Sequence, residues 1–186
     1  MNAFDLPTSL TIGGVGHPIR YGWRNILNIF SAMNDPDMDA EMKSEVILES
    51  FYPNWIRIPI EHIPEALEKA CEFMDCGYKK DDVKRPRLVD WEQDAAVIIP
   101  AVNAVANREI RLDPNIHWWT FHGWYMAIEG GLFSTVLRIR QKQARGKKLD
   151  KCEEEFLSEN RRLVELQRPQ TAEEKAMQDY FDKWLK

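Results

Sequence analysis

The sequence predicts a mainly α-helical, compact protein with a short β-hairpin at its N-terminus and charged helices at its C-terminus. Apolar residues recur at helical spacing through most of the chain, and the strand-like segments near the start flank a run of glycines. The C-terminal part combines a thin apolar stripe with dense charge. We therefore expect a helical core domain over residues 1–148, which includes the hairpin, and a C-terminal helical pair or arm over residues 149–186.

The composition excludes several classes of protein. The chain has 186 residues, of which 44% are hydrophobic and 30% charged, so it can bury a core and is not a disordered chain. No apolar run approaches the roughly 20 residues of a bilayer-spanning helix, and we expect no secretory signal. The net charge of −5 argues against a general affinity for nucleic acid. An odd number of cysteines without tight spacing predicts a reducing cytoplasm rather than a disulfide framework.

The glycine run near the N-terminus predicts a hairpin. "SLTI" and "HPIRY" are strand-like, and the glycines of "GGVG" between them can adopt the positive φ of a tight turn. The alternative is a phosphate-binding loop, because Gly14 and Gly16 match half of a G-x-G-x-x-G motif. Ile19 stands where the third glycine belongs, and Pro18 continues an extended segment, so we favour the hairpin.

The chain after the hairpin is predicted to be helical. An apolar stripe predicts a helix over residues 23–33, a second helix ends near residue 51, and a third covers residues 60–74 with Pro64 in its first turn. "DCGYKKDDVKRPR" is the clearest linker. A central helix is expected over residues 89–108, and Pro100 should kink it.

The segment "HWWTFHGWYMAIEGG" predicts a short helix that begins after Asp113 and Pro114 and ends at two glycines. Three of its aromatic residues fall on one helical stripe, and we expect this stripe to be a core anchor. No Lys or Arg lies between residues 117 and 128, so a base-stacking platform would lack cations. The expected core anchor consists of Trp118, Phe121 and Tyr125.

The sequence offers no candidate for a catalytic or metal site. His117 and His122 are five residues apart and face different sides of a helix, whereas paired metal ligands on one helix are four apart. There is no G-x-S-x-G motif and no cysteine in a recognisable reactive context. We therefore expect no catalytic residues, no metal, no cofactor and no enzymatic activity.

A basic run over residues 138–148 is a candidate for contact with nucleic acid. Its ordinary interpretation is a solvated helix end, where cations also suit the negative end of the helix dipole. The net charge of the chain favours the ordinary interpretation. The candidate patch comprises Arg138, Arg140, Lys142, Arg145, Lys147 and Lys148.

The C-terminal part contains the apolar residues that we consider for partner binding. Thr171 and Glu174 predict a capping box that opens a closing amphipathic helix. Ordinary packing onto the body is an equally supported alternative, and "FYPNWIRIP" is a second candidate for which core packing is favoured. The candidate partner-binding residues are Phe156, Leu163, Leu166, Met177, Tyr180, Phe181 and Trp184.

Four segments together resemble a known family. They are the strand end and helix of "IRYGWRNILNIF", the acidic-aromatic-Asp-Ala entry of "VDWEQDAAVIIPAVNAV", the aromatic helix of "IHWWTFHGWYMAI" and the Phe-x-x-x-x-x-Ile-Arg pattern of "GGLFSTVLRIRQ". In this order they resemble the small tail proteins of long-tailed phages and prophages of Gram-positive bacteria. Genes for those proteins lie between the major tail protein and the tape-measure protein. The resemblance covers most of residues 10–145.

The resemblance implies a non-enzymatic tail assembly chaperone. Such a protein would bind and solubilise the tape-measure protein in the cytoplasm of the host bacterium and would be absent from the mature virion. The major tail protein is a further partner to consider, self-association is expected, and a membrane partner is not. A structural tail component, such as a completion or joining protein, and a small nucleic-acid-binding phage regulator are the alternatives.

Overall fold

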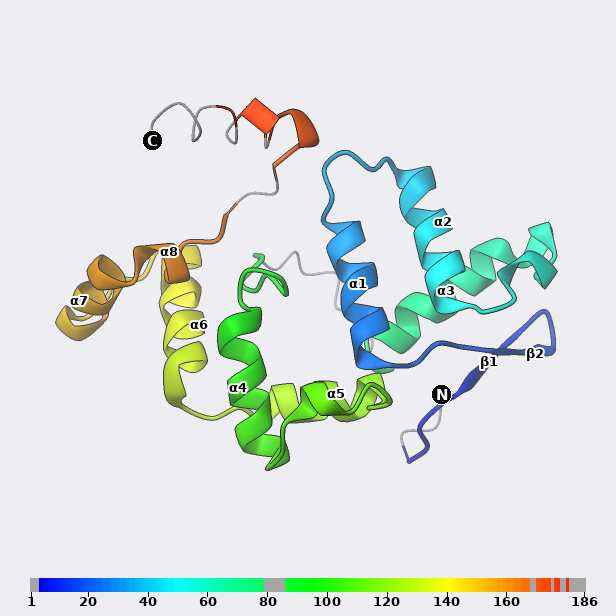
Figure 1. Ribbon diagram of the computed structural model, residues 1–186, viewed down its shortest axis with the longest axis horizontal. Helices are drawn as coiled ribbons and strands as arrows, with labels where there is room; N and C mark the ends of the chain where they lie inside the picture. The colour runs from blue at the N-terminus through cyan, green and yellow to red at the C-terminus, as the bar shows by residue number, and fades with distance from the viewer. Residues whose placement is uncertain (1–3, 79–85, 168–169, 175, 178–179, 181–186) are drawn as a thin grey trace. The chain divides into compact units, whose positions relative to one another are not determined.

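The computed structural model describes residues 4–78, 86–167, 170–174, 176–177 and 180. These residues are mainly helical with one two-stranded hairpin near the N-terminus, which confirms the predicted fold class (Figure 1). The chain forms two compact units. Unit 1 contains residues 1–77 and 168–186, and unit 2 contains residues 78–167. This division and the one expected at residue 148 fall at different places in the chain.

Unit 1 opens with the predicted hairpin. Strands β1 (Ser9–Ile12) and β2 (Val15–Pro18) pair antiparallel. Gly13 and Gly14 form the turn between them with φ values of 54° and 80°, and two successive positive φ values are what a type I′ hairpin turn requires. The second strand therefore begins at Val15, two residues before the segment that the sequence suggested, because the turn takes only two of the three glycines.

The hairpin turn is docked onto another part of unit 1. The backbone N–H of Gly13 donates to the carboxylate of Glu65 at 2.9 Å. A Cβ atom at Gly13 would lie 2.5 Å from the imidazole of His62, so only glycine fits there. The glycine run is thus explained by a turn and a close contact.

Three α-helices and two short 3-10 turns follow the hairpin within residues 19–77 of unit 1. Helix α2 begins after Asp39, whose side chain accepts the N–H of Met42. Pro64 lies in the first turn of α3, as predicted. The elements are α1 (Trp23–Met33), α2 (Ala40–Phe51), η1 (Trp55–Arg57), η2 (Ile60–His62) and α3 (Ile63–Met74).

The core of unit 1 lies where α2 packs against α1 and α3. Phe51 at the end of α2 is fully buried and its ring lies 5.2 Å from that of Phe73 on α3. Arg20, just after the hairpin, donates to the carbonyl oxygens of Glu49 and Ser50, which lack helical partners at the end of α2. These contacts tie the hairpin, α2 and α3 into one body.

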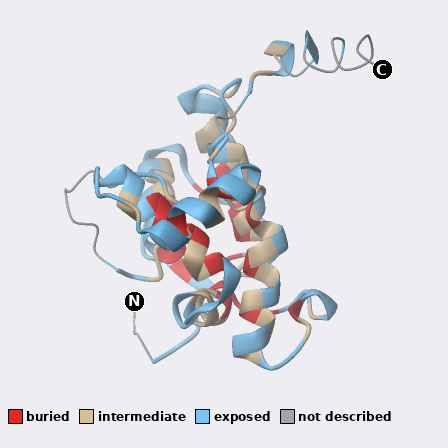
Figure 2. Ribbon diagram, turned by 90° about the vertical axis from the view of Figure 1, so that its left-hand side faces the viewer, coloured by how far each residue is buried: buried red, intermediate tan, exposed pale blue. Residues whose placement is uncertain are grey.

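Unit 2 contains the remaining helices. Figure 2 colours the chain by burial and shows helices in which buried or intermediate residues alternate with exposed ones. Helix α4 begins at Ala95, later than the predicted Val89, because the Asp90 side chain accepts the N–H groups of Glu92 and Gln93 and holds a turn there. The elements are α4 (Ala95–Ala106), η3 (Ile110–Leu112), α5 (Trp118–Met126), α6 (Gly131–Ala144), α7 (Lys151–Glu159) and α8 (Arg161–Val164).

Helix α5 starts at a different cap from the expected one. Its N-cap is the buried His117, whose Nδ1 atom accepts the N–H of Trp119 at 3.1 Å, and not the Asp113–Pro114 pair. That role requires an unprotonated Nδ1, so this histidine has a structural explanation. Among the described helices, none is both long and apolar enough to cross a membrane.

Candidate partner-binding surface

Helix α4 is the most unusual surface element of unit 2. Its sequence, AAVIIPAVNAVA, contains one polar side chain, and such an all-apolar helix normally lies inside a protein. Only Ile98 and Val102 of α4 are buried. The polar residue, Asn103, is half-buried and its hydrogen bonds are satisfied locally, because its amide binds the Glu109 carboxylate and the N–H of Ile110, both at 2.9 Å. The apolar outer face is therefore left on the surface.

This outer face forms one wall of a shallow apolar groove, which we call the α4 groove. Its volume is about 350 Å³. The second wall is the connection from α5 into α6, where the side chain of Leu132 is 49% exposed. The groove is lined by Ala96, Val97, Pro100, Ala101, Ala104 and Val105 of α4 and by residues 128–133.

The second wall owes its shape to two glycines. Gly130 has φ of 72° and ψ of −168°, a combination that is essentially restricted to glycine. Gly131 also has a positive φ, and a Cβ atom on either residue would meet no neighbour within 4 Å. The two glycines are thus required by the backbone conformation, which turns the chain into α6 beside α4, and not by crowding.

The α4 groove has a distinctive polarity. Glu129 is the one ionisable side chain among its lining residues, and none of them is a cation. Proline has no N–H, so Pro100 cannot donate to the carbonyl of Ala96, and both of these exposed residues line the groove. The groove therefore combines one carboxylate with an apolar surface, at a turn of α4 that lacks one intrahelical hydrogen bond.

The aromatic residues expected to anchor the core lie behind this surface. Trp118 and Phe121 are buried and stacked, with ring centroids 5.7 Å apart, and Tyr125 is half-buried. Trp91 contacts all three rings and is closest to Tyr125, at 4.9 Å. Burial raises the pKa of Tyr125 to about 12. The aromatic cluster is thus interior structure.

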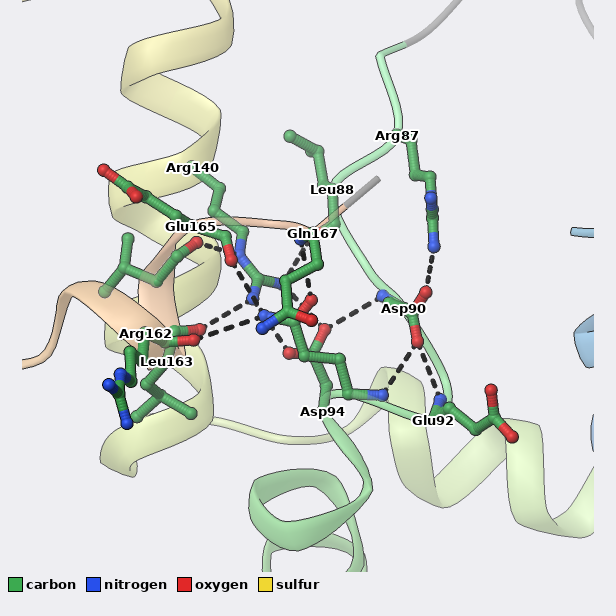
Figure 3. Close-up of polar contacts among 12 residues, drawn as sticks. Arg87, Leu88, Asp90, Glu92, Asp94, Arg140, Arg162, Leu163, Glu165 and Gln167 are labelled. Carbon is green, nitrogen blue, oxygen red and sulfur yellow. Dashed lines mark hydrogen bonds and ion pairs between the residues drawn. The ribbon is translucent and has the colours of Figure 1, made fainter. Parts of the chain in front are cut away.

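Arg140 was expected on the basic patch, but it is only 4% exposed. Figure 3 shows its guanidinium between two segments of unit 2. It binds both carboxylate oxygens of Asp94, at 2.6 and 2.8 Å, and donates to the carbonyls of Leu88, Leu163 and Val164 at 2.7 to 2.8 Å. All five donors of the guanidinium are used. Arg140 is therefore a clamp that joins α6, α8 and the start of α4, and it cannot contribute to a nucleic-acid surface.

The rest of the predicted basic patch is partly neutralised. Arg138 and Lys142 both bind Glu153 of α7, at 3.1 and 2.5 Å. The hydrogen bond from Lys142 and one from the backbone of Asp150 lower the pKa of Glu153. The three remaining cations of the run, Arg145, Lys147 and Lys148, are exposed.

The predicted partner-binding residues of α7 and α8 are engaged in packing. Phe156 and Leu163 lie against the buried cluster of Val136, Ile139 and Val164. This favours the ordinary-packing alternative for these two residues, although both are only half-buried and Phe156 also lines an open hollow on the surface of unit 2. Leu166 is half-buried and lines a separate hollow beside Arg140.

The closing segment belongs to unit 1. The N–H groups of Thr171 and Glu174 bind each other's side chains at 3.1 and 3.2 Å, which confirms the predicted capping box. Met177 and Tyr180 are exposed. The other two predicted partner-binding residues, Phe181 and Trp184, lie outside the residues that the structure describes.

Sequence reasoning missed two features of unit 2, the α4 groove and the Arg140–Asp94 clamp. The sequence contained a signal for the groove, because the α4 segment is apolar except for Asn103. The clamp joins positions 46 residues apart, and no spacing rule links them. In unit 1, the "FYPNWIRIP" segment buries Ile58, as expected for core packing, but leaves Ile56 82% exposed.

The part of the chain that the structure describes contains no group of three or more His, Cys, Asp or Glu side chains that could hold a metal ion. Neither a search of curated proteins nor a search of solved structures found a match to the chain. A family described as bacteriophage Gp15 protein matches residues 4–166, which includes the helices of both units from α1 to α8. The chain therefore belongs to the bacteriophage Gp15 protein family.

Proposed function

We propose that this protein is a tail assembly chaperone that binds and solubilises the tape-measure protein of its phage. The observation that carries the proposal is the α4 groove, an apolar surface on a member of a bacteriophage family. A tape-measure protein is long and helical, and its exposed apolar stripes promote aggregation before the tail tube covers them. Docking such a helix in an apolar groove is a common mode of peptide recognition.

The proposal includes the setting in which the protein acts. It works without catalysis in the cytoplasm of the host, several copies cover one tape measure, and it leaves before the virion is complete. The major tail protein is a second partner in this scheme, because tube subunits replace the chaperone on the tape measure. The contacts of Arg138, Arg140 and Lys142 with carboxylates weigh against the alternative of a nucleic-acid-binding regulator.

The decisive experiment is co-expression with the tape-measure protein of the same phage. We expect the tape measure to move from the insoluble to the soluble fraction and to co-purify with this chain. An unrelated small helical protein expressed at the same level is the control for general effects on solubility. A tape measure that stays equally insoluble with both proteins would contradict the proposal.

Analysis of purified virions separates a chaperone from a structural tail component. We expect mass spectrometry of virions to detect the tape-measure protein but not this chain. Its presence at a fixed ratio to the tape measure would favour a completion or joining protein.

A further inference from the structure

We infer that the α4 groove binds a helix whose large apolar side chains face the groove and which carries a basic residue near one end and a hydrogen-bond donor near its middle. The occupant to which we commit is a helix of the tape-measure protein, so the inference rests on the proposed function and deepens it. Three properties of the groove define this occupant.

The first property is the size of the lining residues. Ala96, Pro100 and Ala104 follow one another at intervals of four along the exposed face of α4, and Gly130 and Gly131 form part of the opposite wall. Small residues leave space and supply little apolar area of their own. The bulky side chains must therefore come from the occupant, at the i, i+3, i+4 and i+7 positions of one helical face.

The second property is charge. The lining of the α4 groove contains the carboxylate of Glu129 and no cation, and the whole chain carries a net charge of −5. Glu129 lies in the connection between α5 and α6, outside the stretch lined by α4. A basic residue near one end of the occupant is complementary to it, whereas an acidic residue there would be repelled.

The third property is the carbonyl of Ala96. Water can bind this oxygen while the groove is open, but an apolar occupant would displace that water and leave the acceptor without the helical donor that Pro100 lacks. An occupant with a Ser, Thr, Asn, Gln or Lys side chain opposite Ala96 avoids this loss. The groove thus discriminates among apolar helices as well as in favour of them.

The test measures binding of overlapping peptides that tile the tape-measure sequence to the full chain by fluorescence anisotropy. We expect the bound peptides to be apolar on one helical face with a basic residue near one end. Ala104→Glu should weaken their binding about a hundredfold, because docking would bury an unpaired carboxylate. Ala144→Glu changes an exposed alanine of α6 that does not line the groove, and should leave binding unchanged.

Two further variants test the polar contacts. Glu129→Lys should weaken binding of a peptide with a lysine near its end, and a peptide in which that lysine is replaced by glutamate should recover it. Pro100→Ala gives the Ala96 carbonyl an intrahelical donor, and we expect about fivefold weaker binding because the peptide donor loses its acceptor. Circular dichroism confirms that each variant is folded.

The outcomes distinguish this inference from the proposed function. If the tape measure neither co-purifies with the wild-type chain nor yields a binding peptide, both fail. If the wild type binds and Ala104→Glu binds equally well, the inference is wrong while the chaperone proposal stands. Loss of binding in Ile56→Glu or in Met177→Glu, with Ala104→Glu unaffected, would assign the partner to unit 1 instead.

Discussion

Helices α4 and α5 of unit 2 are both strongly apolar and each has two buried residues. Helix α5 buries two large aromatic rings, those of Trp118 and Phe121, whereas α4 leaves Ala96, Pro100, Ala104 and Val105 exposed. The difference follows from side-chain size. The rings of Trp118 and Phe121 on α5 are buried and pack against the half-buried ring of Trp91, and aromatic rings of this size bury much apolar area. The exposed residues on the outer face of α4 include the small side chains of Ala96, Pro100 and Ala104, which offer less apolar area for packing, and this surface remains available.

The apolar character of a helix and its position in the core are therefore separate properties. The Arg140–Asp94 clamp and the α5 cluster form the frame of unit 2, and the outer side of α4 is its face. Changes in the frame should reduce the stability of the unit, whereas changes on the face should alter partner binding and leave stability almost unchanged. Three measurements test this distinction.

The largest effect is expected from Arg140→Ala. It leaves the Asp94 carboxylate buried without its partner and removes the donors to three carbonyls, so we expect a loss of about 5 kcal/mol in the free energy of unfolding, measured with urea. Arg138→Ala is the matched control from the same basic run, because Arg138 is 58% exposed and its removal should cost at most about 1 kcal/mol. Equal effects of the two changes would refute the role of Arg140 as a clamp.

The second effect concerns the aromatic cluster. Trp118→Ala should lower the free energy of unfolding by about 4 kcal/mol, because it removes a fully buried side chain and opens a cavity. Trp118→Phe keeps part of the contact with Trp91 and should cost less, which guards against a variant that fails to fold. On the face, Ala104→Glu should change stability by less than about 0.5 kcal/mol. If Ala104→Glu destabilises the protein as much as Trp118→Ala does, the outer side of α4 is part of the core and the distinction between the two helices is wrong.

The smallest effect is a dependence on pH. Lys142 and the backbone of Asp150 hold the pKa of Glu153 below its ordinary value of 4.5. Since the folded-state pKa is the lower one, ionised Glu153 stabilises the fold above pH 4.5, and this contribution disappears as the pH falls through the folded-state pKa. Glu153→Gln should therefore be less stable than wild type at neutral pH, and the two should converge in acid. A gap that widens in acid would contradict this assignment.

Several elements could be predicted because their causes are local. The apolar stripe of α1, the position of Pro64, the glycine hairpin turn and the Thr171 capping box each depend on residues within a few positions of one another. The start of α5 was misplaced even so, since a histidine cap is an uncommon signal that depends on burial of the ring.

The segments that carry the family resemblance also prove to be structural. Asp94 lies in the segment that enters α4, Arg140 ends the Phe-x-x-x-x-x-Ile-Arg pattern, and the two form the buried clamp. Trp118 and Phe121 of the aromatic helix complete the frame. These motif residues, which resemble the family, therefore belong to the frame of unit 2. They do not belong to the face that we propose to bind the partner.

The helical class, the hairpin and the family can be predicted from the sequence, because periodicity, turn residues and short motifs are properties of neighbouring positions. The tertiary structure establishes which apolar and charged residues are available to a partner. It buried Arg140 within a run of more exposed cations and packed Phe156 against the core, while it left the outer face of α4 on the surface. Accessibility depends on which distant segments come to cover a residue, and a one-dimensional pattern does not contain that information.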